Sequence, residues 1–343
     1  MSNSSLLPIL KSVSRSFYLS MRILPRGMRE SIAIAYLLAR AADTIADTAA
    51  IDREHRLSYL HLFRSFILMD YHTEDIRKLC NALVPQISES SEKNLLESIE
   101  NILELFHNLP SENFSSVQKV VATLTEGMVM DLNTFNEPNG IVALKTHDDL
   151  ENYTYLVAGC VGEFWTTLSL QHVHTIKHWD KNHYQLLGIE FGKALQLTNI
   201  IRDVAKDARL GRSYIPEHAL KSNGLNTALL LDKNNDHLLR PLIHDLIQHA
   251  LEYFDSAELY FLAIPRRAFR LRLAALWPIL IGIKTLAKIS KKGNFLDPDI
   301  SIKVSRAWVY RMLLTSLIGV FSNSLTKRWI KILRNSIESN KTH

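Results

Sequence analysis

The chain has 343 residues, of which 47% are hydrophobic and 22% charged, so it can bury a large core and is not a disordered protein. It contains 12 glycines and 10 prolines, about half of their usual share, which favours long helices over a β-sandwich or a β-barrel. The net charge is +5, and the two cysteines, Cys80 and Cys160, exclude a disulfide scaffold and a cysteine-rich zinc module.

Apolar residues recur at helical spacing along most of the chain. The first clear case is the stretch 31–49, where they stand three, four and seven residues apart. Comparable stretches follow at 92–107, 115–132, 149–171, 184–206, 238–262, 267–290, 299–320 and 324–338. Turn residues interrupt the pattern at Pro110, 137–140, 222–226 and 291–298. We therefore predict an all-α protein with a single domain over residues 1–338, in which 299–338 form a basic C-terminal helical appendage.

The charge is unevenly distributed. Residues 261–343 contain 16 lysines and arginines but 3 acidic residues, whereas the rest of the chain is acidic. Such a segment suits an anionic membrane surface or another polyanion, and a solvated helical face is the ordinary alternative. The apolar run 6–10 is too short for a secretory signal, and the longest uncharged stretch, 312–326, is below the roughly 18 residues that span a bilayer. We expect a cytoplasmic monomer without a transmembrane segment or a nucleic-acid partner, touching the inner membrane surface through 299–338.

Aspartate pairs four residues apart are the first chemical signal. Side chains at this spacing share one face of a helix, roughly 5–6 Å apart, so two carboxylates can hold one Mg²⁺ ion. Three such pairs occur, Asp43/Asp47, Asp203/Asp207 and Asp232/Asp236, whereas chance predicts about one. A single pair is therefore uninformative, and its surroundings must decide.

The surroundings separate the three pairs. Asp232/Asp236 lies in the polar stretch LDKNNDH, which we interpret as a solvated loop. The other two pairs each end an apolar helical run and follow an arginine, Arg40 or Arg202. We expect Asp43 and Asp47 to face the same way as the apolar residues of their helix. Carboxylates in that position are costly unless they are paired or bind a metal, although a surface helix with like charges explains either pair alone.

Four histidines crowd into the stretch QHVHTIKHWDKNHY. His174 and His178 have a spacing compatible with a metal site, but no glutamate frame or cysteine accompanies them. We interpret this cluster as a surface feature of a polar connection.

Several motifs together resemble the squalene/phytoene synthase family of head-to-head prenyl synthases. They are SRSF at 14–17, YLLARAADTIAD at 36–47, GMVMD at 127–131, YTYLVAGCVG at 153–162, QLTNIIRDVAKDARLGRSYIP at 196–216 and RLRLAALWPILIGIKTLA at 270–287. Their order and spacing agree with the family, and the segment ARAADTIAD is more similar to squalene synthases than to phytoene synthases.

The resemblance implies an all-α isoprenoid synthase fold with a central apolar cavity that binds two farnesyl diphosphates. It also implies that Mg²⁺ ions bind to oxygen ligands in the two aspartate motifs, namely Asp43, Asp47, Asn199, Asp203 and Asp207. The positions that would bind the diphosphates are Ser14, Arg15, Ser16, Tyr36, Arg40, Gln196, Asn199, Arg202 and Arg212. Metal cations and guanidinium groups stabilise the negative charge that develops on a departing diphosphate.

Tyr153 matches the family's tyrosine that is thought to stabilise carbocations or assist proton loss, a role that suits an electron-rich ring. A core aromatic with a satisfied hydroxyl is the ordinary alternative. The small residues Ala158, Gly159 and Gly162 have two compatible explanations, which are close helix packing and room for an isoprenoid chain.

The expected reaction is condensation to presqualene diphosphate followed by reduction with NADPH to squalene. The alternatives are a synthase that stops at presqualene diphosphate, or one that makes dehydrosqualene or phytoene. Departures from the family pattern at Ala46, Thr48, Leu156 and Lys206 concern the second half-reaction. A non-enzymatic family member would be expected to have lost the aspartate pairs. A purely structural helical protein would leave the pairs apart, whereas the enzyme requires them to face each other across a deep apolar cavity.

Overall fold

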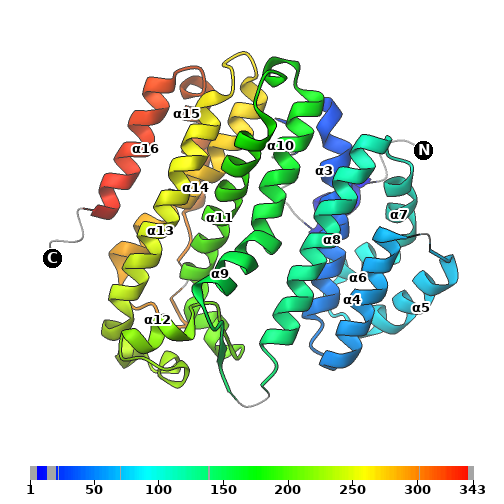
Figure 1. Cartoon of the computed structure of the whole chain (residues 1–343), viewed down its shortest axis with the longest axis horizontal. Coiled ribbons are helices and arrows are strands. Elements are labelled where there is room, and N and C mark those ends of the chain that lie inside the picture. Colours follow the sequence, from blue (N-terminus) through cyan, green and yellow to red (C-terminus); the bar gives the residue numbers. More distant parts are fainter. Residues whose placement is uncertain are drawn as a thin grey trace. The chain divides into compact units, whose positions relative to one another are not determined.

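The computed structural model describes residues 6–13, 21, 23–69, 71–137, 140–300 and 302–338, and these are almost entirely helical (Figure 1). The described residues contain only two strands, of two residues each, so the predicted all-α fold is confirmed. The chain divides into two compact units, residues 1–133 with 167–174 and residues 134–166 with 175–343. The single domain over 1–338 stays a prediction.

The first unit is built around the buried helix α3 (Arg26–Asp47), which packs against α4, α6 and α7. Its other elements are α1 (Leu6–Val13), α4 (Arg53–Leu68), α5 (Thr73–Leu83), η1 (Val84–Gln86), α6 (Ser90–Glu97), α7 (Ile99–His107) and most of α8 (Ser111–Thr134). Asp52 caps α4 by accepting a hydrogen bond from the His55 amide, which fixes where the chain turns after α3.

The second unit centres on the long helix α11 (Lys181–Arg209), which packs against α13 and α14. Its other elements are β1 (Val142–Ala143), α9 (His147–Thr154), the π-helix η2 (Tyr155–Gly159), the start of α10 (Cys160–His172), η3 (His174–Ile176), β2 (Arg212–Ser213), α12 (Glu217–Ser222), η4 (Thr227–Leu231), η5 (Lys233–Asn235), α13 (Asp236–Ala263), α14 (Phe269–Lys292), α15 (Arg306–Gly319) and α16 (Asn323–Glu338). The strands pair in parallel, with Val142 opposite Arg212 and Ala143 opposite Ser213.

Glycines bring the segment 158–162 into backbone contact with α11. A Cβ atom at Gly162 would lie 1.7 Å from the carbonyl oxygen of Gly188, and a Cβ atom at Gly192 would lie 2.2 Å from that of Ala158. No side chain larger than a hydrogen atom fits at Gly162 or at Gly192 unless the backbone shifts. Close helix packing, one of the two explanations that the sequence offered for these small residues, is therefore confirmed.

A fully buried arginine, Arg272, ties the end of the second unit together. Its guanidinium donates to the carbonyl oxygens of Val320 (2.7 Å) and Ile264 (2.5 Å) and to Oδ1 of Asn323 (2.7 Å). It also lies over the ring of Phe261, 4.3 Å from the centroid. Burial lowers the pKa of Arg272 to about 10, so the side chain stays charged at neutral pH and holds α14 to the turn between α15 and α16.

The predicted helices are present with shifted ends. The stretch 299–320 becomes helical only at Arg306, and the helices α4 and α5 were not predicted. Among the described residues, α14 alone is long and apolar enough to cross a membrane, and 61% of its apolar window is buried inside the protein. A search for uncharged stretches misses α14 because it contains Lys284. A buried core helix meets the same length and composition test, so the absence of a transmembrane segment stays a prediction.

Substituting Gly162 by alanine should destabilise the second unit, because the new methyl group overlaps the backbone of Gly188. We expect a loss of about 1–3 kcal/mol or more, measured as a lower denaturation midpoint by circular dichroism. The matched control is Gly319→Ala in α15, where a Cβ atom meets nothing within 4 Å and the stability should be unchanged or slightly higher. Equal midpoints for the two variants would contradict the packing argument.

Candidate functional site

The first aspartate pair lies at the C-terminal end of α3. The helix ends at Asp47, where Nη1 of Arg56 from α4 donates to the carbonyl oxygen of Ala46 at 2.7 Å. The hydroxyls of Thr44 and Thr48 satisfy two further carbonyls, those of Arg40 and Thr44, at 3.0 and 2.6 Å. These bonds complete the last turn and hold the acidic residues in helical register.

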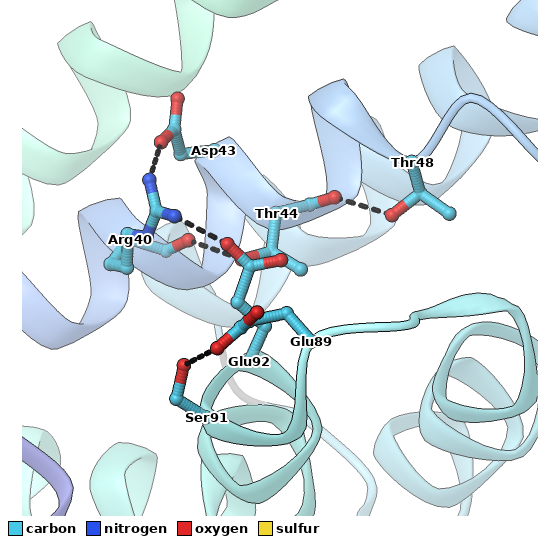
Figure 2. A network of polar contacts seen from close by, with 7 residues as sticks. All are labelled: Arg40, Asp43, Thr44, Thr48, Glu89, Ser91 and Glu92. Atoms are coloured by element: carbon cyan, nitrogen blue, oxygen red, sulfur yellow. Dashed lines mark hydrogen bonds and ion pairs between the residues drawn. The ribbon is translucent and has the colours of Figure 1, made fainter. Parts of the chain in front are cut away.

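Arg40 links the acidic end of α3 to helix α6. Its guanidinium donates from Nη1 to Asp43 and from Nη2 to Glu92, as Figure 2 shows. Among the described residues, no acceptor reaches the buried Nε of Arg40. Burial, followed by the charge of Asp47, raises the pKa of Asp43 in spite of the opposing guanidinium. Arg40 therefore only partly neutralises Asp43.

The pair differs from the expectation in its orientation. The side chain of Asp43 is 40% exposed and Asp47 is exposed, whereas Leu37, Leu38 and Ala41 form part of the buried face. Most of the residues in α3 are buried, so the apolar spacing alone could not identify the polar side. The aspartates lie on that polar side, in the same stripe of i, i+3 and i+4 positions as Tyr36 and Arg40.

The second pair lies in the last two turns of α11. Arg202 forms a forked pair with its neighbour Asp203, with Nε to Oδ1 at 2.9 Å and Nη2 to Oδ2 at 2.5 Å. This hydrogen bonding raises the pKa of Arg202. One turn earlier, Asn199 donates weakly to Oε1 of Gln196 at 3.5 Å, and its amide is exposed.

A chain of contacts connects the second pair to Tyr153. Nε of Arg212 lies 3.6 Å from Oδ1 of Asp207, and the guanidinium lies 5.9 Å from the ring centroid of Tyr214. Tyr214 in turn stacks on Tyr153, with centroids 4.5 Å apart. Gly211 has φ +78°, and the tight turn it permits places Arg212 in the short strand β2.

Tyr153 itself is 7% exposed and stands two residues before the start of the π-helix η2. Such π segments are rare and frequently lie at functional sites. The second unit therefore connects Tyr153 to Asp207 and Arg212, which lie more than 50 residues after it in the sequence.

The predicted site residues are divided between the two units, and three of them fall outside the described part of the chain. Ser14, Arg15 and Ser16 lie outside the described residues. Tyr36, Arg40, Asp43 and Asp47 share one helix of the first unit, and the other predicted residues belong to the second. The apolar cavity between the two pairs, and their approach across it, stay predictions.

Three residues that contact the predicted set were not identified from the sequence. Glu92 binds Arg40, Arg56 completes the end of α3, and Tyr214 stacks on Tyr153. Tyr214 lies inside the motif GRSYIP, so the motif could have indicated it. Glu92 and Arg56 lie outside every motif, and no pattern pointed to them.

The interpretation of Asp232/Asp236 was wrong for one member. Asp236 is 8% exposed and begins α13, where its carboxylate accepts hydrogen bonds from the amides of Asn294 (2.9 Å) and Leu296 (3.2 Å). Asp232 is exposed, as expected. Partners 58 and 60 residues downstream make Asp236 a structural residue, and a local pattern cannot reveal them. His174 and His178 are exposed, which agrees with a surface cluster.

The two retained pairs fit Mg²⁺ by their donor chemistry. They offer carboxylate oxygens, the ligands that Mg²⁺ prefers, and two carboxylates leave room for the water and phosphate oxygens that usually complete its shell. Both pairs also lie at helix C-termini, where the backbone carries partial negative charge. The pKa of Asp43 is raised by burial first and then by the charge of Asp47, so a bound cation would favour its ionised form.

Comparisons with known proteins agree with the motifs. Residues 10–308 match the sequence model of the squalene/phytoene synthase family. Over 304 residues, or 88% of the chain, it is 28% identical to a bifunctional lycopene cyclase/phytoene synthase of Leptosphaeria maculans, of which it spans 47%. Over 299 residues, or 86% of the chain, it is 26% identical to a squalene synthase of Saccharomyces cerevisiae, of which it spans 63%. The chain thus spans about half the length of the first of these relatives.

The fold also has solved counterparts. A complex of TcSQS with the ligand E5700 superposes with a TM-score of 0.72 and 19% sequence identity, and the match covers 98% of each chain. At this identity the likeness shows the fold alone, which is the predicted helical type.

Replacing Asp236 by alanine should destabilise the protein, because the half-buried amide of Asn294 and the buried amide of Leu296 lose their acceptor. We expect a loss of about 1–3 kcal/mol in the free energy of unfolding, measured by chemical denaturation. Asp232→Asn is the control and should lie within about 0.5 kcal/mol of the parent, because the exposed side chain keeps an acceptor for the Asn234 amide. A reversed order would mean that the structural aspartate is misidentified.

Proposed function

The chain belongs to the squalene/phytoene synthase family, whose members are prenyltransferases, and from this premise we propose that it is a squalene synthase. It condenses two molecules of farnesyl diphosphate head to head to presqualene diphosphate and then reduces this intermediate with NADPH to squalene. The observation that carries the proposal is the pair of arginine-bound aspartate clusters at the ends of α3 and α11.

Asp43, Asp47, Asp203 and Asp207, with the exposed amide of Asn199, are the residues that would hold Mg²⁺. The bound ions would stabilise negative charge on the leaving diphosphate. The carboxylates are positioned before any ion arrives, because Arg40 and Arg202 already hold one member of each pair. Preorganisation of this kind lowers the cost of ordering the site when substrate binds.

The arginines have a second role toward the diphosphate. A guanidinium forks readily to phosphate oxygens, and the side chain of Arg40 is 34% exposed. Glu92 fixes Arg40 from α6, so the guanidinium is already oriented when the anion enters. Arg212 is oriented in the same way by Asp207 and by the short strand pair. Both side chains can therefore bind a diphosphate without first becoming ordered.

Tyr153 supports the cationic part of the reaction. Its ring is buried against Tyr214, and stacked electron-rich rings stabilise positive charge in a site that excludes water. Arg212 lies on the Asp207 side of this stack, so the groups for the leaving anion and for the carbocation are neighbours in the second unit. Ionisation of the substrate gives a diphosphate anion and an allylic carbocation. Arg212 would stabilise the anion, and the stacked rings of Tyr153 and Tyr214 would stabilise the carbocation.

A phytoene synthase is the second candidate function. The observation that favours it is the 28% identity to the fungal bifunctional lycopene cyclase/phytoene synthase, which is slightly higher than the 26% identity to the yeast squalene synthase. The segment ARAADTIAD supports squalene synthase instead. Synthases that stop at presqualene diphosphate or make dehydrosqualene use the same first ionisation, so the lipid product decides among all four.

The C-terminal helices supply a surface for membrane contact. Large apolar side chains are exposed along α15 and the following turn, at Tyr310, Leu314, Leu317, Ile318, Phe321 and Leu325. Basic residues flank them, at Arg306, Arg311, Lys327, Arg328 and Lys331. This combination of apolar and basic residues suits the headgroup region of an anionic bilayer. We propose that it holds the enzyme at the membrane, into which a long hydrocarbon product dissolves.

The purified protein should form squalene from farnesyl diphosphate, Mg²⁺ and NADPH, and presqualene diphosphate when NADPH is omitted. The products are identified by mass spectrometry of the extracted lipids. Formation of presqualene diphosphate alone with NADPH present would reject the reductive step, and conversion only of geranylgeranyl diphosphate would favour phytoene synthesis.

Removal of Mg²⁺ by a chelator should stop diphosphate release, because the carboxylate pairs then lack the cation that joins them to the leaving group.

Asp43→Asn and Asp203→Asn should each lower diphosphate release by at least about 100-fold, because each removes one charged ligand from a metal-binding pair. Release of inorganic pyrophosphate measures the effect, and circular dichroism checks that the variants fold. Asp232→Asn is the matched control and should keep the parental rate. A strong loss in the control together with active Asp43→Asn protein would show that the wrong pairs were chosen.

The protein should sediment with vesicles that contain anionic lipid and much less with neutral vesicles, and added salt should weaken the binding. A double variant, Leu314→Asp with Ile318→Asp, should lose most of it, because both side chains are strongly exposed on α15. Leu186→Asp on α11 is the control, since this leucine is 60% exposed but lies away from the basic segment in the sequence. Equal binding of the two variants would overturn the proposed surface.

A further inference from the structure

A second cluster of ligand-type side chains lies outside the aspartate pairs. Oε1 of Glu151 lies 3.8 Å from Nε2 of His147 and 3.6 Å from Nε2 of His249. The two imidazole rings lie against each other, with centroids 5.1 Å apart. One ligand atom from each residue lies within 4.8 Å of the other two, and no other such group of three occurs among the described residues. All three residues belong to the second unit.

The spacing suits a transition-metal ion. Ligand atoms about 2.1 Å from a tetrahedral zinc ion are about 3.4 Å apart, which is close to both observed distances from Glu151. Two imidazoles with one carboxylate are also a known zinc ligand set that leaves a position open for water. Imidazole nitrogen favours Zn²⁺ and its neighbours over Mg²⁺, so the chemistry differs from that of the aspartate pairs.

The carboxylate of Glu151 is oriented by a second set of contacts. Its other oxygen, Oε2, accepts hydrogen bonds from Nζ of Lys193, at 2.7 Å, and from the phenol of Tyr253. Burial and this hydrogen bond raise the pKa of the Tyr253 phenol, which therefore remains a donor. With Oε2 satisfied, Oε1 is the oxygen directed at the two histidines. Partners that fix a ligating carboxylate in this way strengthen metal binding.

The helices place the three ligands by local rules. His147 and Glu151 are four residues apart on α9, whose start is fixed by a capping box between Thr146 and Asp149. His249 comes from α13, one turn before Tyr253. The side chain of His147 is 58% exposed, so an ion can reach the cluster from solvent.

We propose that His147, Glu151 and His249 form a site for one Zn²⁺ ion or a similar transition-metal ion, with water in the remaining coordination position. The ion joins α9 to α13. Glu151 precedes Tyr153 by two residues on the same helix, so a bound ion restrains the helix that carries the proposed carbocation-stabilising ring. The site is separate from Mg²⁺ binding and stands on its own geometry, whatever the enzyme makes.

The test uses the full chain without a histidine tag, stripped of metal and kept in saturating Mg²⁺ so that the aspartate pairs are occupied. Titration with Co²⁺ should give one strong set of visible absorption bands per chain, as expected for coordination by nitrogen and oxygen in a four- or five-coordinate site. Zn²⁺ should abolish the bands stoichiometrically. It should also raise the thermal unfolding midpoint, because the ion binds the folded state only.

His147→Ala and His249→Ala should each weaken Co²⁺ binding by at least about 10–100-fold. His178→Ala, which removes an exposed histidine of the second unit, should bind as the parent does, and Asp43→Asn should also retain the bands. Because His147 is mostly exposed, its variant should fold even if that of His249 does not. Parental binding by His147→Ala, displacement of Co²⁺ by Mg²⁺, or absence of the bands would each overturn the proposed site.

Discussion

Negative charge concentrated at two helix ends is the constraint on which the rest of the site depends. Two carboxylates one turn apart repel each other, and a helix C-terminus adds the partial charge of its unpaired carbonyls. Both conditions hold in α3 and in α11. Arg40 and Arg202 relieve part of this repulsion, yet the pKa of Asp43 remains raised. An arrangement that costs stability in the absence of a cation is typical of a site that binds one.

The arginines pair with the carboxylates, and under the proposed function they would also donate to a diphosphate. Arg40 is held by Asp43 on one side and Glu92 on the other, so its orientation depends on helix α6 as well as on its own helix. Arg212 depends on a two-residue strand pair and on the backbone freedom of Gly211. The orientations of Arg40 and Arg212 therefore depend on α6 and on the strand pair, elements that contribute no residue to the predicted metal ligands. Supporting contacts of this kind hold polar side chains in a precise arrangement.

The sequence predicted the helical class and most of the long helices, while its assignment of both aspartate pairs to a site stays a prediction. These features depend on periodicity and on local motifs, which a single chain displays directly. It could not predict which face of α3 is buried, because more than half of the helix is buried, including Ser31 and Thr44, and apolar spacing alone does not mark the polar side. It also misjudged Asp236, whose partners lie about 60 residues away, and it gave no sign of Glu92. Contacts between distant segments decide these features, and a local pattern contains no record of them.

Two acceptors of the buried Arg272, the carbonyl of Val320 and the amide oxygen of Asn323, lie 48 and 51 residues after it in the chain, whereas Ile264 precedes it. During synthesis on the ribosome, the apolar helix α14 therefore emerges well before two of the groups that satisfy the cation near its start. Until residues 320 and 323 follow, part of the guanidinium must stay hydrated, which keeps one side of α14 from packing and leaves an apolar surface uncovered. The nascent chain is thus most prone to aggregation, and most in need of a chaperone, in the interval before its last helices are made.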